Sequence, residues 1–331
     1  DSKELKSFKK LPYPHGIRFE DLHGNPDLRS EKLIQPAIEF QLAKNAGLVI
    51  APFFFTEDDN GAKFNLNLTM LSESIRYFQS QKIQKPLFSM IYIGNAVLTN
   101  SSAIINVVDR YTDEVYQKAV SGHVVAIDNF DAKRMSVESL CGLAKLVFLL
   151  SLENKPVFVK SIGTFGEVLG AIGAAGFIGD KETMSVEYLQ ERPKFFGRPK
   201  NWVYLPEMMD HANEAEARKI GYKCPCPACG GAIAIDATSR KRHLLYSRMK
   251  AMDELSKRIP DKRIDYMKNR LGQAIDFVDY CVSKHRSPFE KTRLALVKWG
   301  QVLDFAKTLK RAEKDSAFEK ALLADLDSKT A

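Results

Sequence analysis

The sequence lacks the long apolar runs that membrane-spanning helices need. A span takes about 18 consecutive, mostly apolar residues, and the longest apolar stretch, residues 143–152, is interrupted by Lys145. The start of the sequence is rich in lysine and has no apolar core of the kind found in secretory signals. We therefore expect a cytoplasmic protein with no membrane partner.

Cysteine is scarce, with 5 in 331 residues. Three of them, Cys224, Cys226 and Cys229, stand close together, which excludes a disulfide-stapled domain and favours a reducing compartment. Glycine-rich phosphate loops are also missing, because neither Gly-x-Gly-x-x-Gly nor Gly-x-x-x-x-Gly-Lys-Ser/Thr follows any apolar run. Nucleotide binding of these two familiar kinds is not supported.

The composition is that of a folded protein with a basic surface. Hydrophobic residues make up 45% and charged residues 27% of the chain, which excludes disorder. The 49 basic and 41 acidic side chains give a net charge of +8. This excess favours an anionic partner without identifying it.

Short apolar runs alternate with helical patterns over much of the chain. Strands are expected at 48–55, 87–93, 123–127, 157–162 and 177–178, and helices at 30–46, 68–81, 101–119, 136–152 and 164–175. Strands separated by helices indicate an α/β fold with a parallel sheet, either open or closed into a barrel. Because the nucleotide loops of open sheets are missing, we favour a (β/α)8 TIM-type barrel whose first strands would precede Asp1, since a full barrel needs roughly 250 residues.

The alternation stops after Asp180. A polar, irregular stretch follows and leads to the cysteine cluster, and from Ser239 onward the sequence is charged and helical, with Pro260 and Pro288 marking breaks. We divide the chain into a barrel domain (1–205), a zinc-binding subdomain (206–250) and a C-terminal helical region (251–331).

The most specific local signal is Cys224-Pro-Cys226-Pro-Ala-Cys229-Gly-Gly. Closely spaced cysteines on a turn can converge on one Zn²⁺ ion, and structural zinc takes four protein ligands. His243 is the favoured fourth ligand, while His211 and Cys281 remain alternatives. A catalytic zinc is disfavoured, because it would keep an open position and recruit more histidine or carboxylate ligands.

Two carboxylates stand directly after apolar runs. Asp128 follows Ile127, and Asp180 follows Phe177-Ile178-Gly179. In a barrel the carboxyl ends of the strands carry the chemistry, so each is a candidate for catalysis or substrate binding. Each can equally be a helix cap, since aspartate is a preferred capping residue.

The order of these features resembles the tRNA-guanine transglycosylase family. The similar stretches are Asp1-Ser2, segments of residues 16–41, Leu87–Ile91, residues 157–180 with Gly176-Phe-Ile-Gly-Asp180, and the cysteine motif. The resemblance covers roughly residues 1–245, and its specific parts are the cysteine motif and the position of Asp180.

The resemblance implies a base-exchange reaction on a nucleic acid. Asp180 would attack the anomeric carbon of the sugar and displace guanine, and a 7-deazaguanine base would then take its place. Asp1 would assist proton transfer at the base. The implied substrate-binding positions are Asp128, Phe54, Lys160 and Gly163. The run from Phe53 to Phe55 could supply the side chains that stack on a base, and packing within a barrel strand is the alternative for these three.

The chain also departs from the family pattern. Lys3-Glu4 replaces two glycines, Thr56 stands where a base-reading aspartate is expected, and Asp128-Asn-Phe-Asp131 replaces a Gly-Gly strand end. Three interpretations follow: a divergent enzyme that acts on DNA, which we slightly favour, a tRNA enzyme, or a non-catalytic zinc-containing partner subunit that binds nucleic acid. A homo- or hetero-oligomer is compatible with each.

Basic residues gather after the cysteine motif, beginning with Arg240-Lys241-Arg242 and continuing to Arg270. Contact with nucleic-acid phosphates is one interpretation. A solvated helix face is the other, because Asp253, Glu254, Asp261 and Asp265 dilute the cluster.

Overall fold

The structure is a computed structural model that describes residues 19–160, 162–178, 202–224, 226, 227, 229, 230, 237–285 and 289–313. Its main sheet has the strands β1 (Val49–Ile50), β2 (Leu87–Ile93), β3 (Gly122–Ile127), β4 (Val157–Lys160) and β5 (Gly176–Ile178). All neighbouring pairs are parallel, and the strands follow one another in chain order. The expected α/β fold with a parallel sheet is thus confirmed.

Helices precede and connect the strands. They are α1 (Phe19–His23), α2 (Pro26–Arg29), the π-helix η2 (Ser30–Ile34), α3 (Gln35–Ala43), α4 (Ala62–Ser80), α5 (Asn95–Leu98), α6 (Ser101–Tyr111), α7 (Glu114–Gln117), α8 (Val137–Ser151) and α9 (Phe165–Ile172). The single helix expected over 101–119 is divided, because Asp113 caps α7 by accepting a hydrogen bond from the Val115 amide at 2.9 Å.

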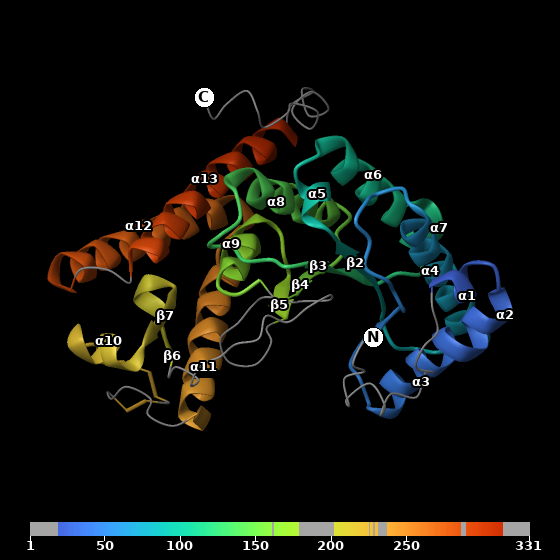
Figure 1. Cartoon of the computed structure of the whole chain (residues 1–331), viewed down its shortest axis with the longest axis horizontal. Helices are drawn as coiled ribbons and strands as arrows, with labels where there is room; N and C mark the ends of the chain where they lie inside the picture. The colour runs from blue at the N-terminus through green and yellow to red at the C-terminus, as the bar shows by residue number, and fades with distance from the viewer. Residues whose placement is uncertain are drawn as a thin grey trace.

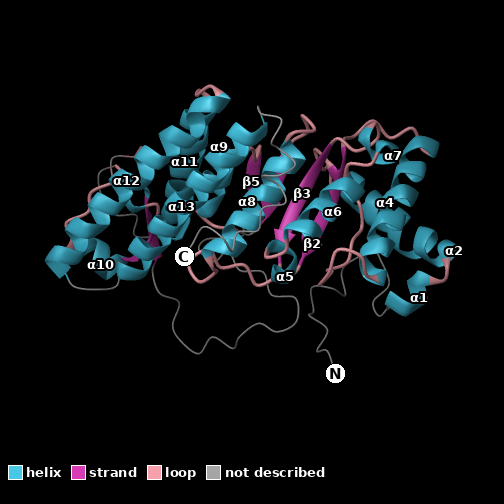
Figure 2. Ribbon diagram, turned by 90° about the horizontal axis from the view of Figure 1, so that it is seen from above, coloured by secondary structure: helices cyan, strands magenta, loops and turns pink. Residues whose placement is uncertain are grey.

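The connecting helices cover one face of the sheet (Figures 1 and 2). Consecutive strands are neighbours, and right-handed crossovers then place every connecting helix on the same side. Leu87, Ile91 and Val125 face these helices and belong to the main core. The opposite face carries a second apolar cluster that includes Tyr92 and Val124. Both faces of the sheet are therefore apolar, as is usual for parallel sheets.

The first expected strand is shorter than the sequence indicates. Of the apolar run 48–55, only Val49 and Ile50 form β1, and the chain returns to the sheet at Thr56, which bridges Ile93. Pro52 lies between these points and has no amide hydrogen to donate to a neighbouring strand. The phenylalanines after Pro52 consequently form a loop at the carboxyl end of β1.

The C-terminal part of the chain packs against the same core. A two-stranded antiparallel sheet of β6 (Trp202–Leu205) and β7 (Asp210–Asn213), with the 3-10 turn η3 (Pro206–Met208) between them, is followed by α10 (Glu214–Lys219), α11 (Ala237–Ser256), α12 (Pro260–His285) and α13 (Glu290–Glu313). In α13 the ring of Trp299 lies 5.6 Å from that of Phe165 in α9. The Lys298 ammonium donates to the carbonyl oxygens of Lys133 and Met135 in the β3–α8 loop.

Because of these contacts, the domain boundaries expected from the sequence fall within parts of the chain that pack together. The division after residue 205 falls inside the β6–β7 hairpin, and the helices beyond residue 251 share the core of the main sheet. Among the described residues the main sheet has β1 and β5 as its edges, so closure into a TIM barrel is not shown. None of the described helices combines the length and the apolar character that a membrane crossing requires.

Candidate functional site

The three clustered cysteines lie on a turn between α10 and α11. The Cys229 and Gly230 amides both donate to the Cys226 carbonyl oxygen, at 3.1 and 3.2 Å, and Gly230 has a φ of +57°. A residue without a β-carbon fits this left-handed position without strain. The turn aims the thiols at α11, where the buried ring of His243 faces them.

Four ligand atoms converge at this point. The Nδ1 atom of His243 lies 3.2 Å from the sulfur of Cys224, 3.2 Å from that of Cys226 and 3.4 Å from that of Cys229, and all four atoms lie within 4.8 Å of one another. Tetrahedral zinc with ordinary bond lengths would separate nitrogen and sulfur by roughly 3.6 Å. The cluster can therefore hold a metal ion, and its donor set is one that zinc favours.

The surroundings fix the histidine and favour a thiolate. The Nε2 atom of His243 lies 2.6 Å from the Tyr204 carbonyl oxygen, so Nε2 carries the hydrogen and Nδ1 faces the sulfurs. Burial raises the pKa of Cys226, but its close polar contacts with His243 and the other two cysteines outweigh burial and lower that pKa to about 7. A thiolate, the form that binds metal, is accessible there near neutral pH.

The structure brings His243 rather than the two alternatives to the cysteines. His211 packs at a tilt against the ring of Tyr204, with 5.3 Å between the ring centroids, and is not part of the cluster. Cys281 is buried near the C-terminal end of α12 as a free thiol. The sequence could rank these candidates only by distance along the chain.

A buried charge network adjoins the cluster, and no pattern in the sequence predicted it. The carboxylate of Glu167 in α9 is fully buried, lies 3.0 Å from the Arg270 guanidinium of α12, and accepts a hydrogen bond from the Tyr204 hydroxyl at 3.1 Å. Burial, together with the nearby Glu167 charge, raises the pKa of Tyr204, which stays protonated. The network links β6, whose Tyr204 carbonyl oxygen contacts His243, to α9 and α12.

A second group of candidates gathers at the carboxyl end of β2. The ring centroids of Phe53 and Phe55 lie 6.0 and 5.4 Å from that of Tyr92. The Tyr92 hydroxyl lies 3.4 Å from Oδ1 of Asp128, which follows β3. Tyr92 itself is buried in the second apolar cluster, so the accessible part of this group is the exposed ring of Phe53 with the partly exposed Phe55 and Asp128 beside it. An aromatic face with a nearby carboxylate is suited to a planar, hydrogen-bonding ligand.

Phe54 does not belong to this group. Its amide and carbonyl are held by the side chain of Asn67 at 2.7 and 2.8 Å, and its ring meets the ring of Phe19 edge-on at 6.4 Å on the helix side of the sheet. The stacking role expected of Phe54 therefore fits its neighbours Phe53 and Phe55 better. Adjacent residues in extended chain point to opposite sides, and the sequence alone could not fix which side faced the helices.

Two further expected positions lie along the same edge of the sheet. Lys160 ends β4 and is partly buried. Gly163 follows with a φ of +56°, and its carbonyl oxygen accepts a hydrogen bond from the Arg248 guanidinium of α11, which stacks 4.1 Å from the centre of the Phe177 ring. The sequence placed Arg248 only in the basic cluster that follows the cysteine motif and Tyr92 only in a strand, because neither residue has a motif around it.

The two expected catalytic residues, Asp180 and Asp1, lie outside the described residues. Asp180 comes two positions after the end of β5, the strand that pairs with β4. Asp131, the second carboxylate of the Asp128-Asn-Phe-Asp131 strand end, is engaged locally, since it accepts a hydrogen bond from the Lys133 amide at 3.0 Å and pairs with Arg134 at 3.3 Å.

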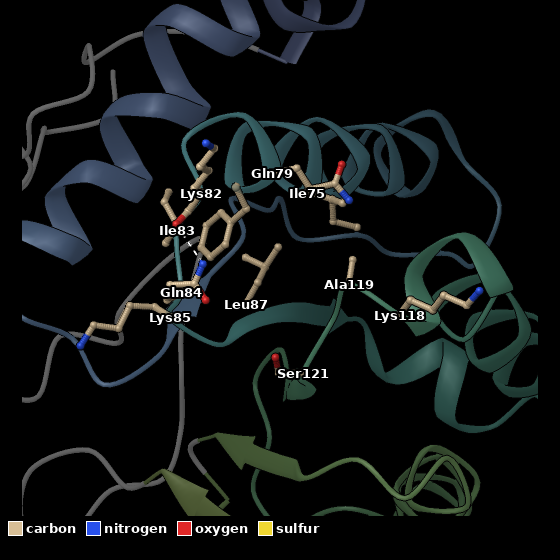
Figure 3. A pocket seen from close by; sticks show the side chains of 11 residues that line it. Ile75, Gln79, Lys82, Ile83, Gln84, Lys85, Leu87, Lys118, Ala119 and Ser121 are labelled. Carbon is tan, nitrogen blue, oxygen red and sulfur yellow. Dashed lines mark hydrogen bonds between the residues drawn. The ribbon is translucent and has the colours of Figure 1, made fainter.

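A cavity of about 480 Å³ opens at the opposite, amino end of β2, as Figure 3 shows. Its floor is apolar, formed by side chains such as Ile75 and Leu87, and the side chains of Lys85 and Lys118 point away from its centre. Lys118 caps the end of α7, an ordinary place for a cation. Because it lies at the amino end of β2, the cavity is remote from the carboxyl ends of the strands, where Asp128 and Lys160 lie.

Comparisons of the chain with protein-family models, with curated proteins and with solved structures return no match.

Proposed function

We propose that this chain is a nucleic-acid guanine transglycosylase that exchanges guanine for a 7-deazaguanine base, with DNA slightly favoured over tRNA. The observation that carries the proposal is the grouping of Phe53, Phe55 and Tyr92 with Asp128 at the carboxyl end of the sheet. A base taken out of its stack needs an aromatic face and a hydrogen-bonding group at its edge, and this group supplies both.

The proposed chemistry proceeds in two displacements. A carboxylate oxygen of Asp180 forms a bond to C1′ of the sugar, the C1′–N9 bond breaks, and guanine leaves with that electron pair and a proton from Asp1. The incoming base then gives its N9 proton to Asp1, and N9 attacks C1′ and releases Asp180 as a carboxylate. The proton balance closes over the cycle, and no oxidant or reductant is needed.

We propose that the cluster binds Zn²⁺ and that the ion has a structural role. Three thiolates and one imidazole fill a tetrahedral site and leave no position for a substrate or water. The ion would fix the turn to α11, and thereby hold Arg248 against the end of the sheet. The proposed TIM-type barrel closure would supply the remaining walls of the substrate site.

The non-catalytic partner subunit is the second candidate, and one observation favours it. Thr56 stands where the family's base-reading aspartate is expected, and it is buried in backbone pairing, with its amide 3.0 Å from the Tyr92 carbonyl oxygen. Base reading would then rest on Asp128 alone.

The test is covalent trapping combined with guanine release. Wild-type protein is incubated with DNA or tRNA labelled in guanine, and released base and denaturation-resistant adducts are measured. The proposal expects both with the wild type and neither with Asp180→Asn, while Asp109→Asn, an exposed acid on α6, behaves as wild type. Binding of nucleic acid without release or adduct by the wild type would instead support the partner subunit.

A further inference from the structure

One face of α11 combines exposed apolar and basic side chains in helical register. Arg242, Tyr246 and Lys250 form a row at four-residue spacing, and Leu245 and Met249 form the row beside it. Leu245 is 61%, Tyr246 41% and Met249 70% exposed. At about 1.5 Å per residue, the face runs about 12 Å from Arg242 to Lys250. We call these five residues the α11 strip.

The exposure of the strip does not come from a loosely attached helix. The opposite face of α11 is packed, with His243 0%, Ser247 8%, Ala251 7% and Leu255 1% exposed. His243 belongs to the metal cluster and is tied to Tyr204. A firmly anchored helix thus presents large apolar side chains to solvent. Isolated exposed apolar residues, which are common on protein surfaces, would not fall into two neighbouring rows.

We propose that the α11 strip binds a single strand of nucleic acid, with phosphates at Arg242 and Lys250 and a base stacked on Tyr246. No acidic residue occurs from Arg240 to Met252. The ammonium of Lys250 meets Glu254 at 3.9 Å, a long contact between exposed groups. A polyanion whose bases have apolar faces matches a row of cations around an aromatic ring.

A second copy of the chain fits the strip less well. A two-fold interface would place the strip against itself, so that Arg242 and Lys250 would meet cations of the same kind. An aligned polyanion has the opposite charge, and it gains from releasing its counterions.

The helix that carries the strip also reaches the carboxyl end of the sheet. Arg248 leaves the same helix on another side and reaches Gly163 and Phe177 at the carboxyl end of the sheet. A strand that follows α11 would therefore lead toward the strand ends where the exchanged base is proposed to lie. The inference rests on the proposed function for its substrate class, and it adds the path of the strand.

The experiment measures binding of fluorescent oligothymidylate and oligouridylate by anisotropy over a series of salt concentrations. Neither probe contains guanine, so binding is measured without base exchange. Tyr246→Ala/Lys250→Ala is compared with Tyr280→Ala/Lys284→Ala, which removes an exposed tyrosine and lysine at the same spacing on α12, where the ammonium lies 6.0 Å from the ring. Sedimentation of each variant without probe reports self-association.

The strip variant is expected to bind at least tenfold more weakly than wild type, while the α12 control is unchanged. Arg242→Ala/Lys250→Ala should reduce the slope of log affinity against log salt by about 1.4, since each lost phosphate contact on a single strand accounts for about 0.7. Tyr246→Phe should retain affinity, because stacking needs the ring and not the hydroxyl. The ratio between the two probes shows whether the strip favours DNA or RNA.

Equal binding by wild type and both strip variants would overturn the proposal. So would loss of self-association in the strip variant with binding intact, which would assign the strip to a second copy. Salt-sensitive binding that depends on the strip, in a protein that exchanges no base, would uphold this inference and refute the proposed enzymatic function.

Discussion

The Nε2 atom of His243 lies 2.6 Å from the main-chain carbonyl oxygen of Tyr204. This contact orients the ring so that Nδ1 faces three sulfur atoms, and it joins α11 to β6. The same tyrosine reaches Glu167 through its hydroxyl. The cysteine–histidine cluster and the packing of the sheet are therefore linked through Tyr204. The link can be tested by changing either the cluster or the ion pair of Glu167.

Loss of a metal ligand should release the ion and loosen α11. We expect Cys229→Ser to reduce bound metal from about one equivalent to near zero and to lower the unfolding temperature by several degrees, because structural metal binding contributes directly to folding. Metal analysis and thermal unfolding with and without a chelator measure this. Cys281→Ala removes a buried thiol outside the cluster and should keep its metal. Full metal content in Cys229→Ser would contradict the assignment.

Breaking the buried ion pair should be costly. Arg270→Met leaves the fully buried carboxylate of Glu167 without its cation. An uncompensated buried charge typically costs about 3–5 kcal/mol of unfolding free energy. The double variant Glu167→Gln/Arg270→Met should recover part of this loss. Urea unfolding of the wild type, the single variants Glu167→Gln and Arg270→Met, and the double variant gives the coupling energy. Strictly additive effects would show that the two groups do not act as a pair.

Replacing each of two helical glycines by alanine should change the free energy of unfolding in opposite directions. A β-carbon on Gly142 of α8 would lie 1.8 Å from the Leu98 carbonyl oxygen, so Gly142→Ala must push α5 away and should cost about 1–3 kcal/mol. A β-carbon on Gly272 of α12 would meet nothing within 4 Å, so Gly272→Ala should stabilise by about 1 kcal/mol. Chemical denaturation measures both, and equal effects would argue against the close α5–α8 packing.

Stability should depend on pH through His123 of β3. Burial, with a smaller contribution from the Lys155 ammonium, lowers the pKa of His123 to about 4 from an ordinary 6.5. The unfolded chain takes up a proton between those values and the folded chain does not, so stability is full above pH 6.5 and falls as pH drops toward 4, by about 3 kcal/mol.

The matched variant for this prediction is His123→Gln. It keeps a polar group that can meet the Ser89 hydroxyl, which lies 2.7 Å from Nδ1 of His123, but it cannot titrate. Unfolding free energies between pH 4 and 7 should therefore vary less in the variant than in the wild type. Parallel pH profiles would show that other groups account for the acid sensitivity.

Local patterns in the sequence were sufficient to predict most elements of the main sheet. Mostly apolar runs mark β2, β3 and β4. In β2 and β3 every residue is buried, and strands buried on both faces do not carry polar side chains in regular alternation. Ser136, expected at the start of a helix, caps α8 by accepting a hydrogen bond from the Ser139 amide. The short spacing of Cys224, Cys226 and Cys229 likewise predicted three members of the cluster that can hold a metal, since a turn of that length leaves their thiols within reach of one ion.

Sequence patterns were enough to predict local features, namely which segments are helix or strand and which three cysteines share a turn. Packing in three dimensions sets which histidine completes the cluster, which of three consecutive phenylalanines face Tyr92, and that Glu167 meets Arg270. Each of these choices joins residues far apart in the chain or depends on which side of a strand faces the helices. Such choices are settled when the helices and the sheet bury their apolar faces together, because the pattern around a single residue does not contain that information.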